Sequence, residues 1–227
     1  MGGADLVQGR IRPNPDQVGR GAPFSRSLDV GASPFFETAN IAYRRSLLEG
    51  LGGFDESFPL PAGEDTDLGH RAVAAGARRA YAEGAEVWHE VHPMDAGEAL
   101  RNAARCDQLI RVVRMYPELE QFFRGPLLLL PHHPRTLAAA GGAVVAAAAL
   151  ARRSPLGVAA GVLAAAPWLR LRLRRQPTVT PKAQRIATLP VQLAVELAEV
   201  GYVVRAALRY RRSTSDATAI SGTGAHE

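Results

Sequence analysis

The spacing of apolar residues predicts a mixed α/β arrangement for the first half of the chain. Apolar positions three or four residues apart indicate helices, which we expect over residues 40–51, 65–75 and 97–116. Short apolar runs bounded by turn residues indicate strands, which we expect at residues 6–11, 79–81 and 86–91. Recurrent proline and glycine predict irregular segments at residues 12–36 and 54–63, and a turn at Glu83-Gly84.

The second half of the chain contains two apolar runs without a charge. Each is 16 residues long, and they cover residues 136–151 and 154–169 on either side of Arg152-Arg153. A helix of that length rises about 24 Å, less than the roughly 30 Å hydrocarbon core of a bilayer. Because basic residues flank the pair, we expect a helical hairpin that dips into a membrane or barely spans it, with the first half of the chain on the cytoplasmic side. The alternative is an alanine-rich hairpin packed against the rest of the protein.

The segments after the hairpin differ from it in composition. Residues 176–185 are expected to form a linker, and residues 191–210 an amphipathic helix with Gln192, Glu196 and Glu199 on one face. The tail beyond residue 212 has the composition of a disordered terminus. The patterns therefore divide the chain into residues 1–125, 126–175, 176–212 and 213–227.

Composition narrows the classes of function. The net charge is +5, yet residues 1–125 hold 14 arginines against 18 acidic residues, so the excess of positive charge belongs to the second half. That half is rich in alanine and leucine and has few aromatic residues for base stacking, so we expect no nucleic-acid partner. Cys106 is the sole cysteine, which excludes a disulfide framework and a cysteine-built zinc site.

Three carboxylates crowd the first turn of the helix expected over residues 65–75. They are Glu64, Asp65 and Asp67. One explanation is helix capping and favourable placement against the helix dipole, which stabilises by roughly 0.3–1 kcal/mol for each acid. The other is chemical: the strand that carries His89 returns about 20 residues later, so acids and imidazole would meet in a cleft at the end of the sheet.

The order of several short motifs resembles glycosyltransferase family 2, enzymes of GT-A fold that move a sugar from a nucleotide-sugar to an acceptor hydroxyl. The resemblance covers roughly residues 5–120. The motifs that carry it are Val7–Arg10, Asn40–Arg45, Gly52–Glu56, Gly63–Asp65 and the strand ending at His89. It implies an α/β fold with an incomplete GT-A-like mixed sheet, followed by the hydrophobic hairpin and the amphipathic helix.

The resemblance also implies roles for individual residues. Asp65 would be the general base that takes the acceptor proton, with Glu64 as a supporting acceptor contact. His89 would help to ligate a divalent Mg²⁺ or Mn²⁺ ion, unless it is simply a strand histidine satisfied by its neighbours. The residues expected to line the substrate cleft are Asn40, Gly53, Phe54 and Gly63. Asn40 has an equally good explanation as the N-cap of the helix expected from Ile41 onward.

The metal motif of the family is an Asp-x-Asp that follows a strand in the nucleotide-binding half. Asp65-Thr66-Asp67 has that spacing but opens a helix, so we interpret it as the base and not the metal clamp. The nucleotide-binding half itself would precede residue 5. The chain is therefore expected to be the carboxy-terminal part of such an enzyme, truncated and inactive without the other half, and the strand at 6–11 is expected to expose an edge.

The expected partners follow from this interpretation. They are a nucleotide-sugar donor, an acceptor of unknown chemistry, membrane lipid and a chain that carries the other half. Divalent metal is expected for the complete enzyme, with no tight metal binding by this chain alone. The alternative function is a non-catalytic, membrane-associated remnant or partner-binding module.

Overall fold

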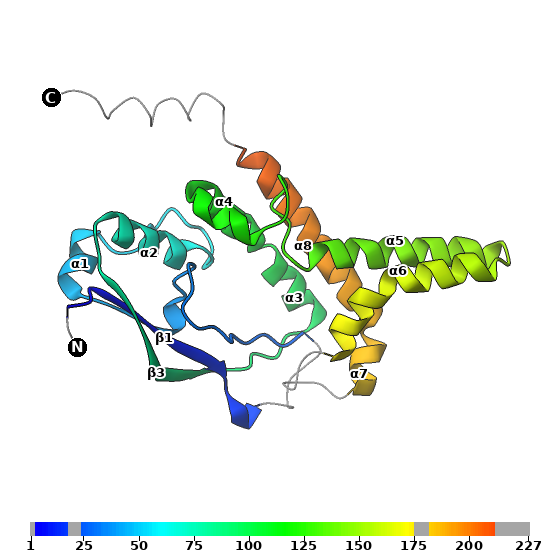
Figure 1. Cartoon of the computed structure of the whole chain (residues 1–227), viewed down its shortest axis with the longest axis horizontal. Coiled ribbons are helices and arrows are strands. Elements are labelled where there is room, and N and C mark those ends of the chain that lie inside the picture. Colours follow the sequence, from blue (N-terminus) through cyan, green and yellow to red (C-terminus); the bar gives the residue numbers. More distant parts are fainter. Residues whose placement is uncertain (1–2, 18–23, 175–181, 212–227) are drawn as a thin grey trace.

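The computed structural model describes residues 3–17, 24–174 and 182–211, and Figure 1 shows their arrangement. A small sheet combines β1 (Leu6–Pro13), β2 (Ile41–Tyr43) and β3 (Arg79–His89) in the order β2-β1-β3. β1 runs antiparallel to β2 and parallel to β3. The mixed α/β class and the strand at 6–11 are confirmed. The expected open edge at that strand was wrong, because β1 is central and pairs on both sides.

Two of the expected boundaries inside the first half were also wrong. The strands at 79–81 and 86–91 are one strand, β3, in which the pairing with β1 jumps from Ala82 opposite Gly9 to Glu86 opposite Arg10. The expected turn at Glu83-Gly84 is therefore a bulge, since β1 holds both ends of β3 in one sheet.

The helix expected over 40–51 begins later than predicted. A single 3₁₀ turn (Thr38–Asn40) leads into β2, and the helix α1 covers only Arg45–Gly50. The pairing of β2 with β1 holds residues 41–43 in an extended conformation and overrides the helix predicted for the whole segment. The helix expected over 65–75 is confirmed as α2 (Glu64–Ala74). In the expected 12–36 loop, β1 continues to Pro13 and a short 3₁₀ turn follows at Pro15–Gln17.

The helix expected over 97–116 is two helices, α3 (Ala96–Ala103) and α4 (Cys106–Met115). α3 begins with a capping box, in which the Asp95 carboxylate accepts from the Glu98 N–H at 2.7 Å and the Glu98 carboxylate accepts from the Asp95 N–H at 2.8 Å. The break at residues 104–105 leaves both helices in contact with α8 (Leu189–Arg209).

The largest apolar core lies between α4, a 3₁₀ segment (Pro117–Phe122) and α8. Its fully buried members include Ile110, Val113, Leu119, Val203 and Ala206. A helix that comes late in the sequence thus completes the core of the first half. The short helix α7 (Lys182–Ala187) precedes α8. The expected disordered tail and most of the expected linker lie outside the described residues.

The predicted hairpin is confirmed as α5 (His133–Ala151) and α6 (Pro155–Arg174), which pack along each other and extend away from the rest of the molecule (Figure 1). The helices have 19 and 20 residues because they continue into the flanking charged segments, so each rises about 30 Å. Gly142 and Gly161 allow the close approach, since a Cβ on either would collide with the backbone carbonyl of the other.

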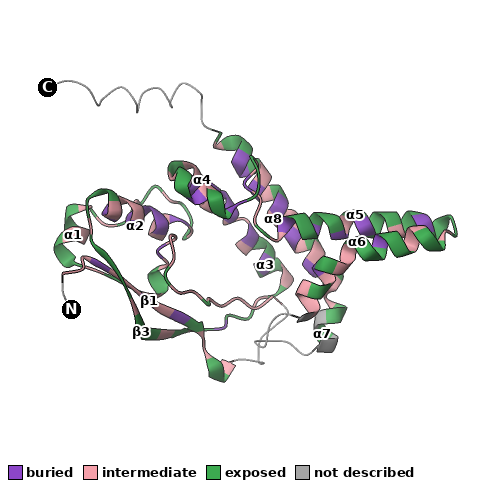
Figure 2. Ribbon diagram, in the orientation of Figure 1, coloured by how far each residue is buried: buried purple, intermediate pink, exposed green. Residues whose placement is uncertain are grey.

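Both hairpin helices are long and apolar enough to cross a membrane. Only 22% of the apolar window of α5 and 11% of that of α6 is buried inside the protein, and Figure 2 shows the exposed residues along both. Leu156 near the tip is 85% exposed. The two helices of the hairpin therefore pack against each other. They do not pack over the rest of the protein, which is what the alternative interpretation required. Membrane association is the environment that its composition suggests.

Glu196 of α8 holds the base of the hairpin from a buried position. Its Oε2 accepts hydrogen bonds from Thr136 Oγ1 of α5 and from Trp168 Nε1 of α6 at 2.8 Å. Its Oε1 forms an ion pair with Arg172. One carboxylate thus joins three helices, and its burial is compensated by two donors and a charge.

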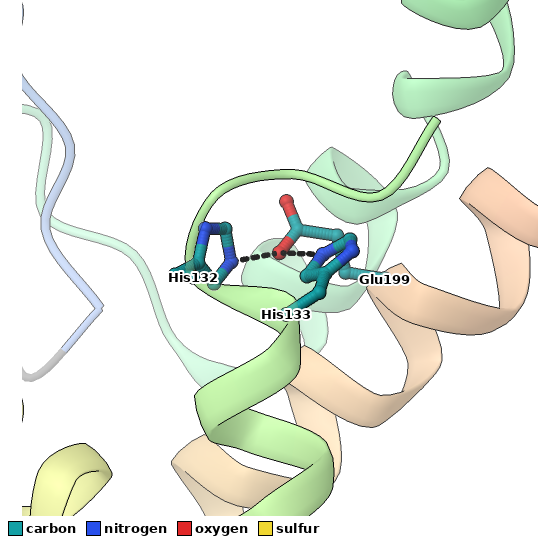
Figure 3. A group of neighbouring side chains, drawn as sticks. All are labelled: His132, His133 and Glu199. Carbon is teal, nitrogen blue, oxygen red and sulfur yellow. Dashed lines mark hydrogen bonds and ion pairs between the residues drawn. The ribbon is translucent and has the colours of Figure 1, made fainter. Parts of the chain in front are cut away.

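Glu199, one turn further along α8, makes a second attachment (Figure 3). Its Oε2 lies 3.0 Å from His132 Nε2 and 3.4 Å from His133 Nε2, at the start of α5. Cys106 Sγ of α4 donates to its Oε1 at 3.5 Å. Burial alone would raise the pKa of Glu199, but the two imidazoles lower it to about 2. The face predicted to hold Glu196 and Glu199 together therefore faces the hairpin.

We predict that Glu199 makes the protein acid-sensitive. Its pKa is lowered in the folded state, so its stabilisation is complete above its ordinary pKa of 4.5 and is lost as the pH falls towards 2. That loss amounts to about 3 kcal/mol. Urea unfolding of the chain in detergent micelles from pH 6 to pH 2 should show a shallower decline for Glu199→Gln than for wild type. The exposed Glu56→Gln is the control, and equal declines for all three proteins would contradict the assignment.

Candidate functional site

The acidic end of α2 begins at a glycine in the left-handed backbone region. Gly63 has φ of +93° and is the N-cap, and its carbonyl accepts from the Asp67 N–H at 2.9 Å. A Cβ at this position would lie 3.2 Å from Val112 Cγ1 of α4, so a side chain is disfavoured by both strain and contact. No side chain caps this helix, and the three acids of the first turn lie where the helix dipole favours negative charge.

Asp67 is engaged inside the protein. It is buried, its Oδ2 accepts from Arg71 Nε at 2.7 Å, and its Oδ1 accepts from the Tyr116 hydroxyl at 2.7 Å. Burial and this carboxylate together raise the pKa of Tyr116. Because these contacts occupy both oxygens of Asp67, it is poorly suited to act as a metal ligand, which supports interpreting Asp65-Thr66-Asp67 as something other than a metal clamp.

Arg71 links the same helix to the turn that contains Gly53. It donates to the Leu51 carbonyl at 3.0 Å and to the Gly53 carbonyl at 2.8 Å. Gly53 has φ of +74°, a left-handed conformation that a glycine provides for this turn. The neighbouring Phe54 ring is 48% exposed and is free to contact a bound molecule.

The surroundings of Asp65 and Glu64 differ from those of Asp67. Burial raises the pKa of Asp65, opposed by hydrogen bonds from the backbone of Thr66, at 2.8 Å, and of Thr38. Burial also raises the pKa of Glu64, as does Asp65, while the positive charge of Arg105 opposes the shift. Glu64 Oε2 is buried and has no hydrogen-bond partner among the described residues. A carboxyl pair with raised pKa is suited to accept a proton.

Two neighbours of Asp65 were missed by the sequence analysis. Burial, followed by the Asp65 charge, raises the pKa of Tyr43 to about 12. The pKa of Glu37 is also raised, first by burial and further by Asp65, although Ser33 Oγ donates to its carboxylate at 2.9 Å. Both residues lie within three positions of the Thr38–Asn40 turn, so their place beside that motif was the available signal.

Asn40 has a structural role that differs from both roles predicted from the sequence, lining the substrate cleft and capping a helix. Its Nδ2 donates to the Arg10 carbonyl at 2.9 Å and to the Ala85 carbonyl at 2.7 Å. These carbonyls lie where β1 and β3 separate at the bulge, so Asn40 replaces the ladder hydrogen bonds lost there. It is not the N-cap of a helix, because β2 follows it.

His89 is the last residue of β3. Its Nδ1 lies 2.7 Å from the Glu90 carbonyl oxygen, and its ring meets that of His92 edge-on at 5.6 Å. Since a carbonyl only accepts, Nδ1 carries the hydrogen and Nε2 keeps a lone pair, the arrangement of most metal-binding histidines. The structure gives no hydrogen bond or ion pair between His89 and Glu64 or Asp65, so the expected meeting of acids and imidazole is not a direct contact.

In the described part of the chain, one group of three metal-type side chains has ligand atoms within 4.8 Å of one another, namely His132, His133 and Glu199. The Leu130 N–H donates to His133 Nδ1 at 3.2 Å. Nε2 of His133 therefore carries the proton and donates to Glu199. That proton disfavours a metal at this position, and the group acts as the hydrogen-bonded attachment of α5 to α8 that Figure 3 shows.

Comparisons with known proteins place this site in a family context. Residues 20–107 match the family described as "Glycosyltransferase like family 2". Chondroitin synthase of Pasteurella multocida (strain Pm70) is 33% identical over 93 residues, which are 40% of this chain and 10% of that protein. Chondroitin synthase of Escherichia coli is 34% identical over 90 residues, 40% of this chain and 13% of that protein. The chain thus spans about a tenth of the length of these curated relatives. No solved structure matches the chain. The matches support a relationship to glycosyltransferase family 2.

We predict that the side-chain donor of Asn40 stabilises the sheet. Asn40→Ala should lower the free energy of unfolding by about 1–3 kcal/mol, because two backbone carbonyls lose their donor. Asn40→Asp should cost at least as much, since a carboxylate cannot donate. Asn14→Asp is the matched control, because Asn14 Oδ1 only accepts, from the Asp16 N–H. Chemical denaturation measures all three variants, and a fully stable Asn40→Asp would exclude this role.

Proposed function

We propose that the first 120 residues or so form the acceptor side of a glycosyltransferase that moves a sugar from a nucleotide-sugar donor to an acceptor hydroxyl. The observation that carries the proposal is the state of the acids at the start of α2, inside the segment that matches the family. The pKa of Asp65 is raised, and Oε2 of Glu64 has no hydrogen-bond partner among the described residues. Both carboxylate oxygens of Asp67, in contrast, accept hydrogen bonds from Arg71 and Tyr116.

In the proposed reaction Asp65 is the general base. The acceptor hydroxyl gives its proton to the Asp65 carboxylate while its oxygen forms a bond to the anomeric carbon of the sugar. The bond between that carbon and the diphosphate oxygen breaks, and its electron pair leaves with the nucleoside diphosphate. A carboxylate whose pKa is raised towards the working pH is a stronger base than an ordinary aspartate. Glu64, whose Oε2 lacks a partner, orients the acceptor.

His89 fits a supporting role near the donor. Its Nε2 is available as a ligand because Nδ1 donates to the Glu90 carbonyl. A bound Mg²⁺ or Mn²⁺ ion would neutralise the diphosphate of the donor, with further ligands from the nucleotide-binding part. We expect that this chain alone does not bind the metal ion tightly.

The nucleotide-binding part, whether joined to this chain or carried by another, would lie beside β3 in a GT-A sheet. β3 is an edge strand that pairs in parallel with β1, yet most of its residues are exposed and Trp88 is 58% exposed. Parallel sheets are normally covered on both faces. This exposure supports a further structural layer against β3, without which we expect no activity.

The hairpin supplies the proposed membrane anchor. The basic residues Arg135 and Arg170 are close to the ends of α5 and α6 that join the rest of the protein. Positive charge beside a membrane segment favours the cytoplasmic side, so the acidic site would act in the cytoplasm at the lipid surface. The charge-free runs of the two helices are still 16 residues long, so the basic ends of α5 and α6 would lie at the membrane surface.

We predict opposite consequences for the two aspartates of α2. In an enzyme assembled with the nucleotide-binding part, Asp65→Asn should lower turnover by roughly 10²–10⁴. Its stability at pH 7 should be unchanged or higher, because burial penalises the charge that the variant removes. Asp67→Asn should lower the free energy of unfolding by about 1–3 kcal/mol, since it weakens the contacts to Arg71 and Tyr116. Sugar-transfer assays and urea unfolding measure the two effects. Near-normal turnover of Asp65→Asn would remove Asp65 from the role of base, and no turnover by the assembled wild type would favour the alternative, a non-catalytic membrane-associated module.

We predict that the exposed hairpin surface binds lipid. The full chain should sediment with membranes and resist extraction by high salt, and deletion of residues 136–175 should release it. Val144→Glu combined with Leu163→Glu should also release it, because a charge in the bilayer is costly. Leu100→Glu is the control, an exposed leucine on α3. A full chain that stays soluble and monodisperse without detergent would contradict the prediction.

A further inference from the structure

A pocket of about 590 Å³ lies beside α3 and is lined mainly by positive and polar side chains. Arg26 comes from the loop after β1, His92 from the segment after β3, and Arg101, Asn102 and Arg105 from α3 and its end. The loop and the segment are held together by a pair of backbone hydrogen bonds of 2.9 Å between Arg26 and His92. The pocket therefore has a fixed wall as well as a charged lining.

The guanidinium groups of this pocket lack carboxylate partners. Among the described residues, Arg26, Arg101 and Arg105 form no ion pair. Arg26 Nη1 donates to the neutral Asn102 Oδ1 at 2.8 Å. The carboxylate that lines the pocket, Glu98, is hydrogen-bonded to the Asp95 N–H at the start of α3.

The positive charges also repel each other. Burial lowers the pKa of Arg26, and the charge of Arg105 lowers it further. Arg26 and Arg105 are partly buried and Arg101 is exposed, and cations that line one pocket in this way are stabilised by an anion bound between them. Guanidinium groups suit phosphate and carboxylate, because their paired N–H groups match two oxygens of either.

The pocket adjoins the acidic site. Arg105 is close enough to Glu64 to oppose the rise in its pKa, and Leu60, three residues before Gly63, also lines the pocket. A molecule that places its hydroxyl at Asp65 would therefore reach the arginines with another of its groups. We infer that this pocket binds an anionic group, a phosphate or a carboxylate, carried by the acceptor substrate. The inference rests on the proposed function, which makes the Asp65 side the acceptor side.

Anion binding is measured directly with the full chain in detergent micelles. Isothermal titration calorimetry with inorganic phosphate and, separately, with glucuronate should detect binding to wild type. Arg101→Gln and Arg105→Gln should each weaken it roughly tenfold, because each removes a charge-assisted contact. Arg79→Gln, an exposed arginine on β3 outside the pocket, is the matched control and should bind as wild type does. Tighter phosphate binding assigns a phosphorylated acceptor, and tighter glucuronate binding assigns a uronic acid.

Two results would overturn the inference. One is the absence of binding, or binding that Arg101→Gln and Arg105→Gln leave unchanged. The other is uridine diphosphate binding more than tenfold tighter than phosphate through the same arginines, which would assign the pocket to the donor. These readouts need no sugar transfer, so they are separate from the test of Asp65. If the assembled wild type transfers no sugar while the arginines still bind anions, the proposed function fails and the acceptor assignment fails with it, but the anion pocket remains.

Discussion

The attachment of α8 to the base of the hairpin is the constraint on which the remaining geometry depends. Glu196 and Glu199 are one helical turn apart. Groups from α5 and α6 bind Glu196, and the two histidines at the start of α5 and the first residue of α4 bind Glu199. Removing one partner of such a buried set leaves an uncompensated charge, which costs several kcal/mol. Further along the same face, α8 completes the core with α4 through Val203 and Ala206, and α4 in turn contacts Gly63 at the start of α2. The hairpin is thereby held in a fixed relation to the acids.

Burial of the acidic side chains at this site destabilises the folded protein. Burial raises the pKa of Glu37, Glu64 and Asp65, so the folded state binds their protons more tightly than the unfolded state does. Stability from these groups therefore falls as the pH rises through their folded-state pKa values. Phe36, buried beside them with φ of +52°, adds backbone strain. Clustered strain and like charge are typical of functional sites, and the well-paired Asp67 on the same helix shows that the fold permits a satisfied acid nearby.

The sequence predicted elements wherever local spacing and tertiary packing agree. The start of α2 followed from Gly63 and the acids, and the hairpin followed from its charge-free runs. β2 was missed because Ile41 was assigned to the same helix as the apolar residues at positions 47, 48 and 51, and pairing with β1 decides otherwise. The break between α3 and α4 has no glycine or proline to signal it and depends on packing against α8. The role of Asn40 and the arginine pocket were beyond local reasoning because their partners lie 30 to 76 residues away in sequence.

The central claim is that Asp65 accepts a proton from an acceptor bound at the start of α2. The most direct test is the pH dependence of kcat for sugar transfer by the chain assembled with its nucleotide-binding part. We predict an acidic limb whose midpoint lies above the ordinary aspartate pKa of 3.8, since burial raises the pKa of Asp65 and only the deprotonated carboxylate acts as a base. Asp65→Glu should keep such a limb at lower activity, and Asp65→Asn should abolish it. The same limb, with the same midpoint, in Asp65→Asn would contradict the claim.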